Sequence, residues 1–531
     1  MSGGGAGGPG EPGRTNHERL LDVLIVLALI YSAAILAASW NRPILDLHGF
    51  RQTQTAVTTY WLLHGGHWIA YETPIVGYPW TLPFEFPLFQ WIVAAVSRTG
   101  LTVDQAGRLT SWLFFLAGLP LSGKVLRRIG VKASLIKTFW VLWLFSPLYV
   151  FWSRSFMIES CAVTLAIAFL AALAAQQGLA LEGRTRRRPV QGLLVVAMVS
   201  FAVMAALVKI TTFVDISLAG GLFTLWSMER GRRAGWKPAK LLGLVAPAGA
   251  AVAAALVVTH AWVDYSDALK ATGLISVDMT SSVLRDWNFG TRRMLDPDMW
   301  RRVIFGRTLI DATGSPLPLF GSLLAAGFLR GSRPLILAAL LLYLAPFFIF
   351  TNVNWVHDYY QFANAMFAIL AVAAGIDAVR HAADAPGTGA GLNWPRLSVI
   401  LLLSVVALEL TSFYARFWPT IREDGWDQRT IAIADVVRRT TAPDSVVFGI
   451  GLDWTSELAY YSQRRAVMLP PWPDPRWNRT STTDLSAWIG NRRLGVVVDC
   501  SNGEYPTLQG WIDRLETGRA MQVVDGCRLY R

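Results

Sequence analysis

Long apolar runs separated by short polar segments fill most of the chain between residues 20 and 417. A helix that crosses a bilayer needs about 20 apolar residues, and eleven runs reach or approach that length. They are residues 20–40, 107–125, 134–152, 157–177, 191–208, 211–228, 241–260, 317–330, 335–351, 361–379 and 397–416. A shorter run, residues 87–96, predicts a helix that lies on the membrane surface. The pattern predicts a mostly α-helical, polytopic membrane bundle of about eleven transmembrane helices.

The positive charges between the runs predict an orientation. If the N-terminus is cytoplasmic, the loops on that side hold clusters of Lys and Arg, whereas the short connections on the other side hold only Arg154 and Lys209. The clusters are Lys124, Arg127, Arg128 and Lys132, then Arg184, Arg186, Arg187 and Arg188, and then Arg230, Arg232, Arg233, Lys237 and Lys240. Short loops rich in Lys and Arg stay in the cytoplasm. We therefore expect a cytoplasmic N-terminus and an extracytoplasmic C-terminus.

The same pattern divides the chain into three regions. Residues 1–19 begin with a stretch rich in Gly and Pro, which predicts a disordered cytoplasmic tail. Residues 20–417 are expected to form the membrane domain. Its two long loops, residues 41–106 and 261–316, are expected on the outer side. Residues 418–531 predict a small extracytoplasmic α/β domain. Its expected helices lie near 428–440 and 454–462, its strands at 445–450 and 494–498, and further short elements at 508–515 and 521–524.

The composition agrees with a membrane protein and excludes other classes. Of 531 residues, 53% are hydrophobic and 16% are charged, whereas soluble domains contain about 25% charged residues. This excludes a disordered chain, a coiled coil, a small disulfide scaffold and an ordinary cytosolic enzyme. The formal charge of +12 is spread over the basic clusters between apolar runs, so we expect no nucleic-acid partner. Cys161 lies in an apolar run, while Cys500 and Cys527 lie in the region expected outside the cytosol, where they could form a disulfide.

Polar and aromatic residues gather in one layer at the expected outer surface. They are Asp46, His48, Arg51, Gln52 and Glu85 in the first outer loop, then Arg154, Glu159 and Lys209, and finally His357, Tyr359, Tyr360 and Gln361. Single members have simpler explanations: Lys209 could reach the interface by snorkelling, Glu159 suits a helix N-terminus, and the two tyrosines suit an aromatic belt. Together they indicate a site, because ionisable groups at helix ends are costly unless paired. Such a layer could bind a phosphate and use a carboxylate as a general base.

Several short motifs follow one another in an order that resembles a known family. They are Glu85-Phe-Pro87-Leu88-Phe89-Gln90-Trp91, Gly107-Arg108, Arg127-Arg128-Ile-Gly, Ser-Pro-Leu-Tyr at 146–149, Ser153-Arg154 with Glu159, and His357-Asp358-Tyr359-Tyr360-Gln361. Over residues 20–380 this order resembles the GT-C membrane glycosyltransferases, in particular bacterial relatives of protein mannosyltransferases and of the aminoarabinose transferase that modifies lipid A. The resemblance implies a GT-C-like bundle with juxtamembrane helices in the first outer loop.

The resemblance also implies an activity in the bacterial inner membrane. A sugar would move from a polyprenyl-phosphate donor to a lipid, glycan or protein acceptor on the outer face. Many relatives carry an acidic pair in the first loop, where this chain has Arg51-Gln52. The base is then either Asp46, which we favour, or Glu85.

The remaining residues of the layer take the following roles in this interpretation. Glu159 positions the acceptor, or a metal in relatives that need one, although no ligand spacing specifies a divalent cation here. Arg51, Arg154 and Lys209 bind the donor phosphate, and His48 and His357 help to hold or protonate the leaving group. Gln52, Tyr359, Tyr360 and Gln361 contact the substrate, with the two tyrosines stacking on the sugar.

Two other classes of protein fit parts of the pattern. A transporter or flippase of lipid-linked sugars would place charges at mid-membrane depth in several broken helices. A scaffold that only presents the C-terminal domain would leave the polar residues scattered. Convergence in space of Asp46, Glu85, Glu159, Lys209 and His357 would favour surface chemistry over both alternatives.

Overall fold

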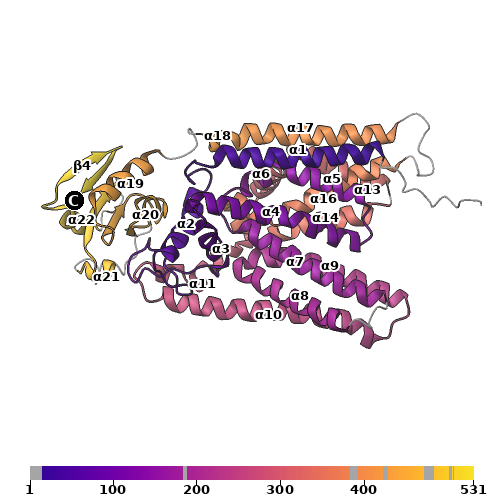
Figure 1. Cartoon of the computed structure of the whole chain (residues 1–531), viewed down its shortest axis with the longest axis horizontal. Helices are drawn as coiled ribbons and strands as arrows, with labels where there is room; N and C mark the ends of the chain where they lie inside the picture. Colours follow the sequence, from indigo (N-terminus) through magenta and orange to yellow (C-terminus); the bar gives the residue numbers. More distant parts are fainter. Residues whose placement is uncertain are drawn as a thin grey trace, which may run out of the picture.

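A computed structural model of the chain describes residues 15–182, 188–329, 331–382, 393–422, 428–471, 484–501, 505 and 508–531. It is an elongated helical bundle with a small α/β domain at one end, beside α2 (Gly49–Leu63) and α3 (Leu88–Ser97) (Figure 1). We call this the domain end of the bundle. Most of the expected N-terminal tail lies outside the described residues, and α1 already begins at Asn16, where Thr15 caps it together with Glu18.

Seven described helices are long and apolar enough to cross a membrane. They are α1 (Asn16–Ser39), α4 (Val103–Arg128), α7 (Glu159–Leu181), α8 (Arg188–Val208), α9 (Ile210–Arg233), α10 (Pro238–Lys270) and α17 (Trp394–Arg416). An eighth span arises if residues 299–313 and α13 (Leu317–Phe328), which meet at a bend of 91°, are counted as one. The protein is therefore a multi-pass membrane protein.

The other predicted runs also form helices, but these are shorter. They are α5 (Ala133–Phe145) with α6 (Pro147–Trp152), α14 (Arg333–Ile349) and α16 (Ala365–Arg380). The break between α5 and α6 falls at Pro147, which cannot donate a backbone hydrogen bond. A helix thus lies on each of the eleven runs, whereas the number of eleven crossings stays a prediction.

Helix α7 is the centre of the bundle. Its spanning segment is 78% buried, and it packs against α4, α8 and α9. Its small and apolar residues, such as Ala162 and Ala166, let the neighbouring helices approach closely. The first residue of α7 is Glu159, so the central helix presents a carboxylate at the domain end.

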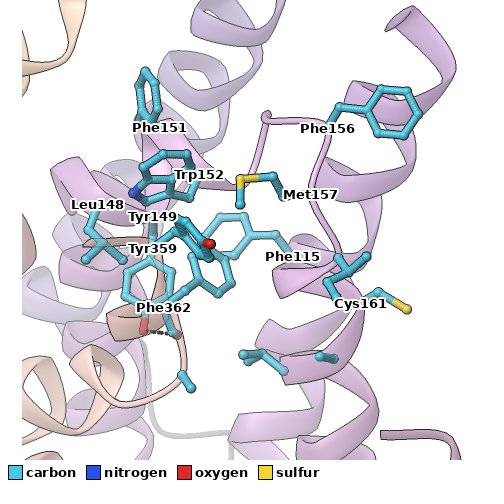
Figure 2. Close-up of a cluster of buried hydrophobic side chains, with 14 of the residues drawn as sticks. Phe115, Leu148, Tyr149, Phe151, Trp152, Phe156, Met157, Cys161, Tyr359 and Phe362 are labelled. Atoms are coloured by element: carbon cyan, nitrogen blue, oxygen red, sulfur yellow. Dashed lines mark hydrogen bonds between the residues drawn. The ribbon is translucent and has the colours of Figure 1, made fainter. Parts of the chain in front are cut away.

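A cluster of aromatic side chains supports the segment that precedes α16 (Figure 2). The Tyr149 hydroxyl donates a hydrogen bond to the Phe362 carbonyl at 2.8 Å, and the Tyr149 ring lies 5.9 Å from that of Phe115. Trp152 contacts Tyr359 with ring centroids 5.8 Å apart. These contacts fix Tyr359 and the residues beside it against α6, because a buried aromatic cluster with satisfied hydroxyls has little freedom to move.

The α/β domain contains a five-stranded sheet in the order β2-β1-β3-β5-β4. The strands are β1 (Val446–Ile450), β2 (Arg465–Met468), β3 (Leu494–Asp499), β4 (Met521–Val524) and β5 (Cys527–Tyr530). β2, β1 and β3 are parallel, and β5 is antiparallel to both β3 and β4. The helices include α19 (Gln428–Thr440), α20 (Glu457–Ser462) and α22 (Gln509–Glu516). The sequence predicted β1, β3, β4 and these helices, but it missed the four-residue strands β2 and β5.

Polar contacts bind the α/β domain to the first long loop of the membrane domain. Thr53 and Ser456 share a hydrogen bond of 2.7 Å between their hydroxyls, and Arg465 pairs with Glu72 at 2.8 Å. The Tyr460 hydroxyl donates to the half-buried Asp104 carboxylate at the start of α4. These contacts come from α2, the loop after it and α4, so the α/β domain is held directly over the domain end.

The structure forms the disulfide that the sequence left open, between Cys500 at the end of β3 and Cys527 in β5. Replacing both cysteines by Ser is expected to destabilise the α/β domain by about 3 kcal/mol, because the bond closes a loop of some 27 residues. The measurement is unfolding of the full-length protein followed by fluorescence. Thiol titration of the unfolded wild type should find the single free Cys161, and three reactive thiols would contradict the bond.

Candidate functional site

Three ion pairs and one histidine–carboxylate pair meet at the domain end, each joining segments that are distant in the sequence. Glu159 pairs with Lys209 at 2.6 Å, Asp46 with Arg154 at 2.7 Å, and His48 with Asp358 at 2.9 Å. Arg51 pairs with Glu85. The residues come from α2 and its flanking loops, the turn between α6 and α7, the start of α9 and the segment before α16.

The Glu159–Lys209 pair lies between the first turns of α7 and α9. The two side chains are only 2% and 6% exposed. The Lys209 ammonium lies 3.8 Å from the centroid of the Tyr360 ring and 5.1 Å from that of Tyr359, which are favourable cation–π distances. Lys209 therefore points into the protein, and snorkelling does not describe it. The aromatic rings face this cation, so an aromatic belt does not account for them.

The Arg51–Glu85 pair is more open than its neighbour. Its side chains are 17% and 25% exposed. Arg51 stands in the first turn of α2 and also donates to the Gln54 amide oxygen. Burial lowers the pKa of the Arg51 guanidinium, but Glu85 together with the weaker effects of Tyr359, Glu159 and Tyr360 raises this pKa by more, so Arg51 keeps its charge. The Arg51 backbone N–H donates to the His48 carbonyl at 2.9 Å. The His48 ring lies 5.0 Å from that of Tyr359, which also faces Lys209, so this pair lies beside the Glu159–Lys209 pair.

The backbone around Glu85 is fixed from two sides. The Tyr71 hydroxyl donates to the Glu85 carbonyl at 2.7 Å and accepts from the Phe84 N–H at 2.8 Å. The Trp262 indole on α10 donates to the Phe84 carbonyl at 3.0 Å. A buried hydroxyl that makes two hydrogen bonds holds its partners in one position. The Glu85 carboxylate is thus presented by a rigid loop.

His48 and His357 lie next to each other in an aromatic group. The ring centroid of His48 is 5.0 Å from that of Tyr359 and 5.6 Å from that of His357. Burial, and then the nearby cations His48, Arg51 and Lys209, lower the pKa of His357 to about 3. His357 is therefore neutral at neutral pH, where it can offer a ring N–H to an anion but no imidazolium proton.

This low pKa predicts how folding depends on pH. The unfolded chain takes up a proton on His357 below about pH 6.5, whereas the folded protein does so only near pH 3. Stability is therefore lost as the pH falls through this interval. The variant His357→Asn should lose less stability than the wild type between pH 7 and pH 4. Thermal unfolding of both proteins across this range is the measurement, and parallel curves would contradict the prediction.

The Asp46–Arg154 pair is more deeply buried than the Arg51–Glu85 pair. Its side chains are 5% and 1% exposed. The Gln52 amide donates to the Asp46 carboxylate, and its oxygen accepts from the Phe156 N–H at 3.0 Å. The Arg154 guanidinium also lies 4.3 Å from the centroid of the Phe151 ring. Asp46, Gln52 and Arg154 therefore join the start of α2 to the turn between α6 and α7.

The segment that carries His357 is held by its own polar groups. The Gln361 amide donates to the Asn354 and His357 carbonyls at 3.1 and 3.2 Å. Arg307, in the π-helix η3 (Met299–Thr308), donates to the Asn354 and Trp355 carbonyls at 2.5 and 3.0 Å. Gln361 is thus engaged with the backbone of this turn, and Arg307 braces the turn from another segment.

Four of the five residues expected to converge are joined through shared neighbours. Glu85 pairs with Arg51, and Glu159 pairs with Lys209. Lys209 and His357 both lie against the rings of Tyr359 and Tyr360. Asp46 reaches this group through Gln52, the residue after Arg51. The sequence did not single out Asp358, although it lies inside the His357–Gln361 motif, or Tyr71, Trp262 and Arg307. Nothing local in the sequence distinguishes those three from other loop and interface residues.

A divalent cation does not fit the arrangement of these side chains. Within the described part of the chain, no three or more His, Cys, Asp or Glu side chains are placed to hold a metal ion together. The carboxylates of Asp46, Glu85 and Glu159 each face a cationic side chain, and Asp358 faces His48. A metal would have to displace these partners, whose charges already satisfy the acids.

Comparisons with known proteins place the fold. No family model matches the chain, and no curated protein matches it. The solved structures of ArnT from Cupriavidus metallidurans are similar over almost the whole length. The apo structure has a TM-score of 0.56 at 15% identity and covers 96% of this chain and 98% of that one. The structure bound to undecaprenyl phosphate has a TM-score of 0.57 at 15% identity and covers 95% and 97%.

A third structure, the arabinofuranosyltransferase AftD from Mycobacteria, matches with a TM-score of 0.48 at 15% identity, covering 86% of this chain and 32% of that chain. The ArnT structures show that this chain has the GT-C-like fold that its motifs predicted.

Proposed function

We propose that this protein transfers a sugar from a polyprenyl-phosphate donor to a hydroxyl of a lipid, glycan or protein acceptor. The observation that carries the proposal is the convergence of Arg51, Glu85, Glu159 and Lys209 with aromatic side chains at one end of a GT-C-like bundle. ArnT, whose fold the chain shares, has been solved with undecaprenyl phosphate bound.

The proposal places this site on the outer face of a bacterial inner membrane. α9 starts with Lys209 at the domain end and finishes with Arg230, Arg232 and Arg233 at the opposite end. α4 likewise finishes with Arg127 and Arg128. Because cytoplasmic loops are enriched in Lys and Arg, the end with these clusters is cytoplasmic and the domain end faces outward.

In this proposal the donor phosphate binds to Arg51 and Lys209. Lys209 lies against Tyr359 and Tyr360, and Arg51 lies one helical turn from His48, which contacts Tyr359. A phosphate oxygen can replace the carboxylates as the partner of both cations. His48 and neutral His357 add N–H donors at the same place. As the anomeric C–O bond breaks, its electron pair stays on the phosphate oxygen, and fixed cations stabilise the negative charge that develops there.

The general base in this proposal is Glu85, and no longer Asp46. The base must reach the acceptor hydroxyl within hydrogen-bond distance. The Glu85 side chain is 25% exposed and sits beside Arg51, whereas the Asp46 side chain is 5% exposed and enclosed by Arg154 and Gln52. Glu85 takes the acceptor proton while the acceptor oxygen bonds to the anomeric carbon, and Asp46 holds the loop. No step is assigned to a metal ion.

Turnover by the purified full-length protein in lipid nanodiscs tests the proposal. The donors are polyprenyl-phosphate sugars radiolabelled in the lipid, a bacterial envelope glycolipid extract supplies the acceptor hydroxyl, and the product is free polyprenyl phosphate. Wild type should release it, and Arg51→Gln should lower the release at least 10²-fold, in line with loss of one charge-stabilising group. Arg98→Gln, which changes an exposed cation of the same loop, is the matched control. Movement of labelled lipid between leaflets without any release would instead support a flippase.

A further inference from the structure

The α/β domain has the edge at which parallel sheets bind ligands. The chain leaves β1 toward β2 on one side and leaves β3 toward β4 and β5 on the other. In open α/β sheets, the crevice at the carboxyl ends of two such neighbouring strands is the usual ligand position. Here β1 and β3 approach closely beyond their ends, since a Cβ on Gly451 would lie 2.5 Å from the Ser501 nitrogen.

This edge of the sheet faces the two segments of the membrane domain that carry Arg51 and Glu85. The loop between β1 and α20 carries Trp454, whose ring lies 4.7 Å from Phe50 and 6.4 Å from Phe84. The Ser456 hydroxyl donates to the Phe50 carbonyl at 2.7 Å. Phe50 precedes Arg51 and Phe84 precedes Glu85, so the loop after β1 rests on the two segments that carry this ion pair.

A cavity of about 480 Å³ opens beside the same loop. Its polar lining comes from the β1–α20 loop and from α19, with one further aromatic residue. These side chains are Asp453, Thr455, Glu457, Arg429, Thr430 and Tyr505. The volume lies in the usual range for a small-molecule site. Among the described lining residues, two carboxylates stand against one guanidinium, so these residues carry no surplus positive charge to hold a phosphate. Carboxylates and hydroxyls are the groups that hydrogen-bond uncharged sugar hydroxyls.

We propose that this cavity binds an uncharged glycan portion of the acceptor and so presents the acceptor hydroxyl to Glu85. The inference rests on the proposed function, because it assigns the acceptor side of that reaction. The cavity at the sheet edge holds the sugar, and Trp454 ties the loop that lines it to the loop that carries Glu85. The acceptor class is then a glycan or glycolipid with neutral sugars.

Saturation-transfer NMR on the full-length protein in nanodiscs tests this assignment. The probes are three neutral trisaccharides, of mannose, of glucose and of N-acetylglucosamine, and no donor is added. At least one should receive saturation from the wild type, and Asp453→Asn and Thr455→Val should each weaken that signal at least tenfold. The matched control is Asp444→Asn, an exposed change before the amino end of β1. No signal from any trisaccharide, or equal signals from all variants, would overturn the assignment.

Two further measurements distinguish failure of the glycan site from failure of the proposed transferase activity and from misfolding of a variant. Thermal unfolding shows whether a variant is folded. The NMR result is taken from whichever of Asp453→Asn and Thr455→Val keeps the unfolding midpoint of the wild type. Release of polyprenyl phosphate is measured on the same samples. Release of polyprenyl phosphate without trisaccharide binding would reject the glycan site and support the transferase. Trisaccharide binding without release from any donor would reject the transferase and support a glycan-binding domain.

Discussion

Glu85→Gln is expected to lower the rate of sugar transfer about 10²- to 10⁴-fold, the usual contribution of a general base. The amide keeps the size of the side chain and can still accept a hydrogen bond from Arg51, but it cannot take a proton from the acceptor. The loop should stay in place, because Tyr71 and Trp262 hold its backbone rather than the carboxylate. Single-turnover release of polyprenyl phosphate at saturating donor measures the chemical step.

Glu72→Gln is the matched control for this variant. Glu72 lies in the same loop and also pairs with an arginine, Arg465 of the α/β domain, at 2.8 Å. Its loss should leave the single-turnover rate within about threefold of the wild type, because Glu72 faces Arg465 and is assigned no role in proton transfer. Retention of the full rate by Glu85→Gln, or an equal loss in both variants, would reject Glu85 as the base.

The helices of the bundle could be predicted because their signal is local. Apolar runs such as residues 157–177 and 397–416 coincide with α7 and α17, since burial in lipid requires a continuous apolar segment. The strands β2 and β5 escaped prediction because each has four residues and is defined by its neighbours in the sheet. Whether the shorter helices α5, α14 and α16 cross the membrane depends on packing that a run of residues does not encode.

The residues of the site could be predicted as a set, but their pairing could not. Polar residues at one end of several helices were visible in the sequence, because ionisable groups are rare there. Partner choice depends on which helices pack together. Lys209 meets Glu159 because α7 and α9 are neighbours. Asp46 looked like a base by its position in the loop, and only the partner Arg154 reveals that it is enclosed.

The largest effect on stability is expected from breaking the Asp46–Arg154 pair on one side. Arg154→Met leaves the Asp46 carboxylate buried without its cation, and a loss of about 3–5 kcal/mol is typical of this situation. The pair is almost inaccessible to solvent, so screening by water does not reduce the effect. The combined variant Asp46→Leu with Arg154→Met should recover most of the loss, because it removes both buried charges. Reversible unfolding measures the stability of the wild type, of Arg154→Met and of the combined variant.

The same variants show whether Asp46 holds the loop in place or acts as the catalytic base. If Asp46 holds the loop, the combined variant folds and keeps a measurable rate of sugar transfer, since Glu85 is unchanged. Asp435→Asn, which breaks an exposed pair with Arg438, should cost less than about 1 kcal/mol and serves as the control. If Asp46→Asn instead unfolds like the wild type and yet loses transfer 10²-fold or more, the base is Asp46, and the Arg51–Glu85 pair becomes a part of the phosphate site.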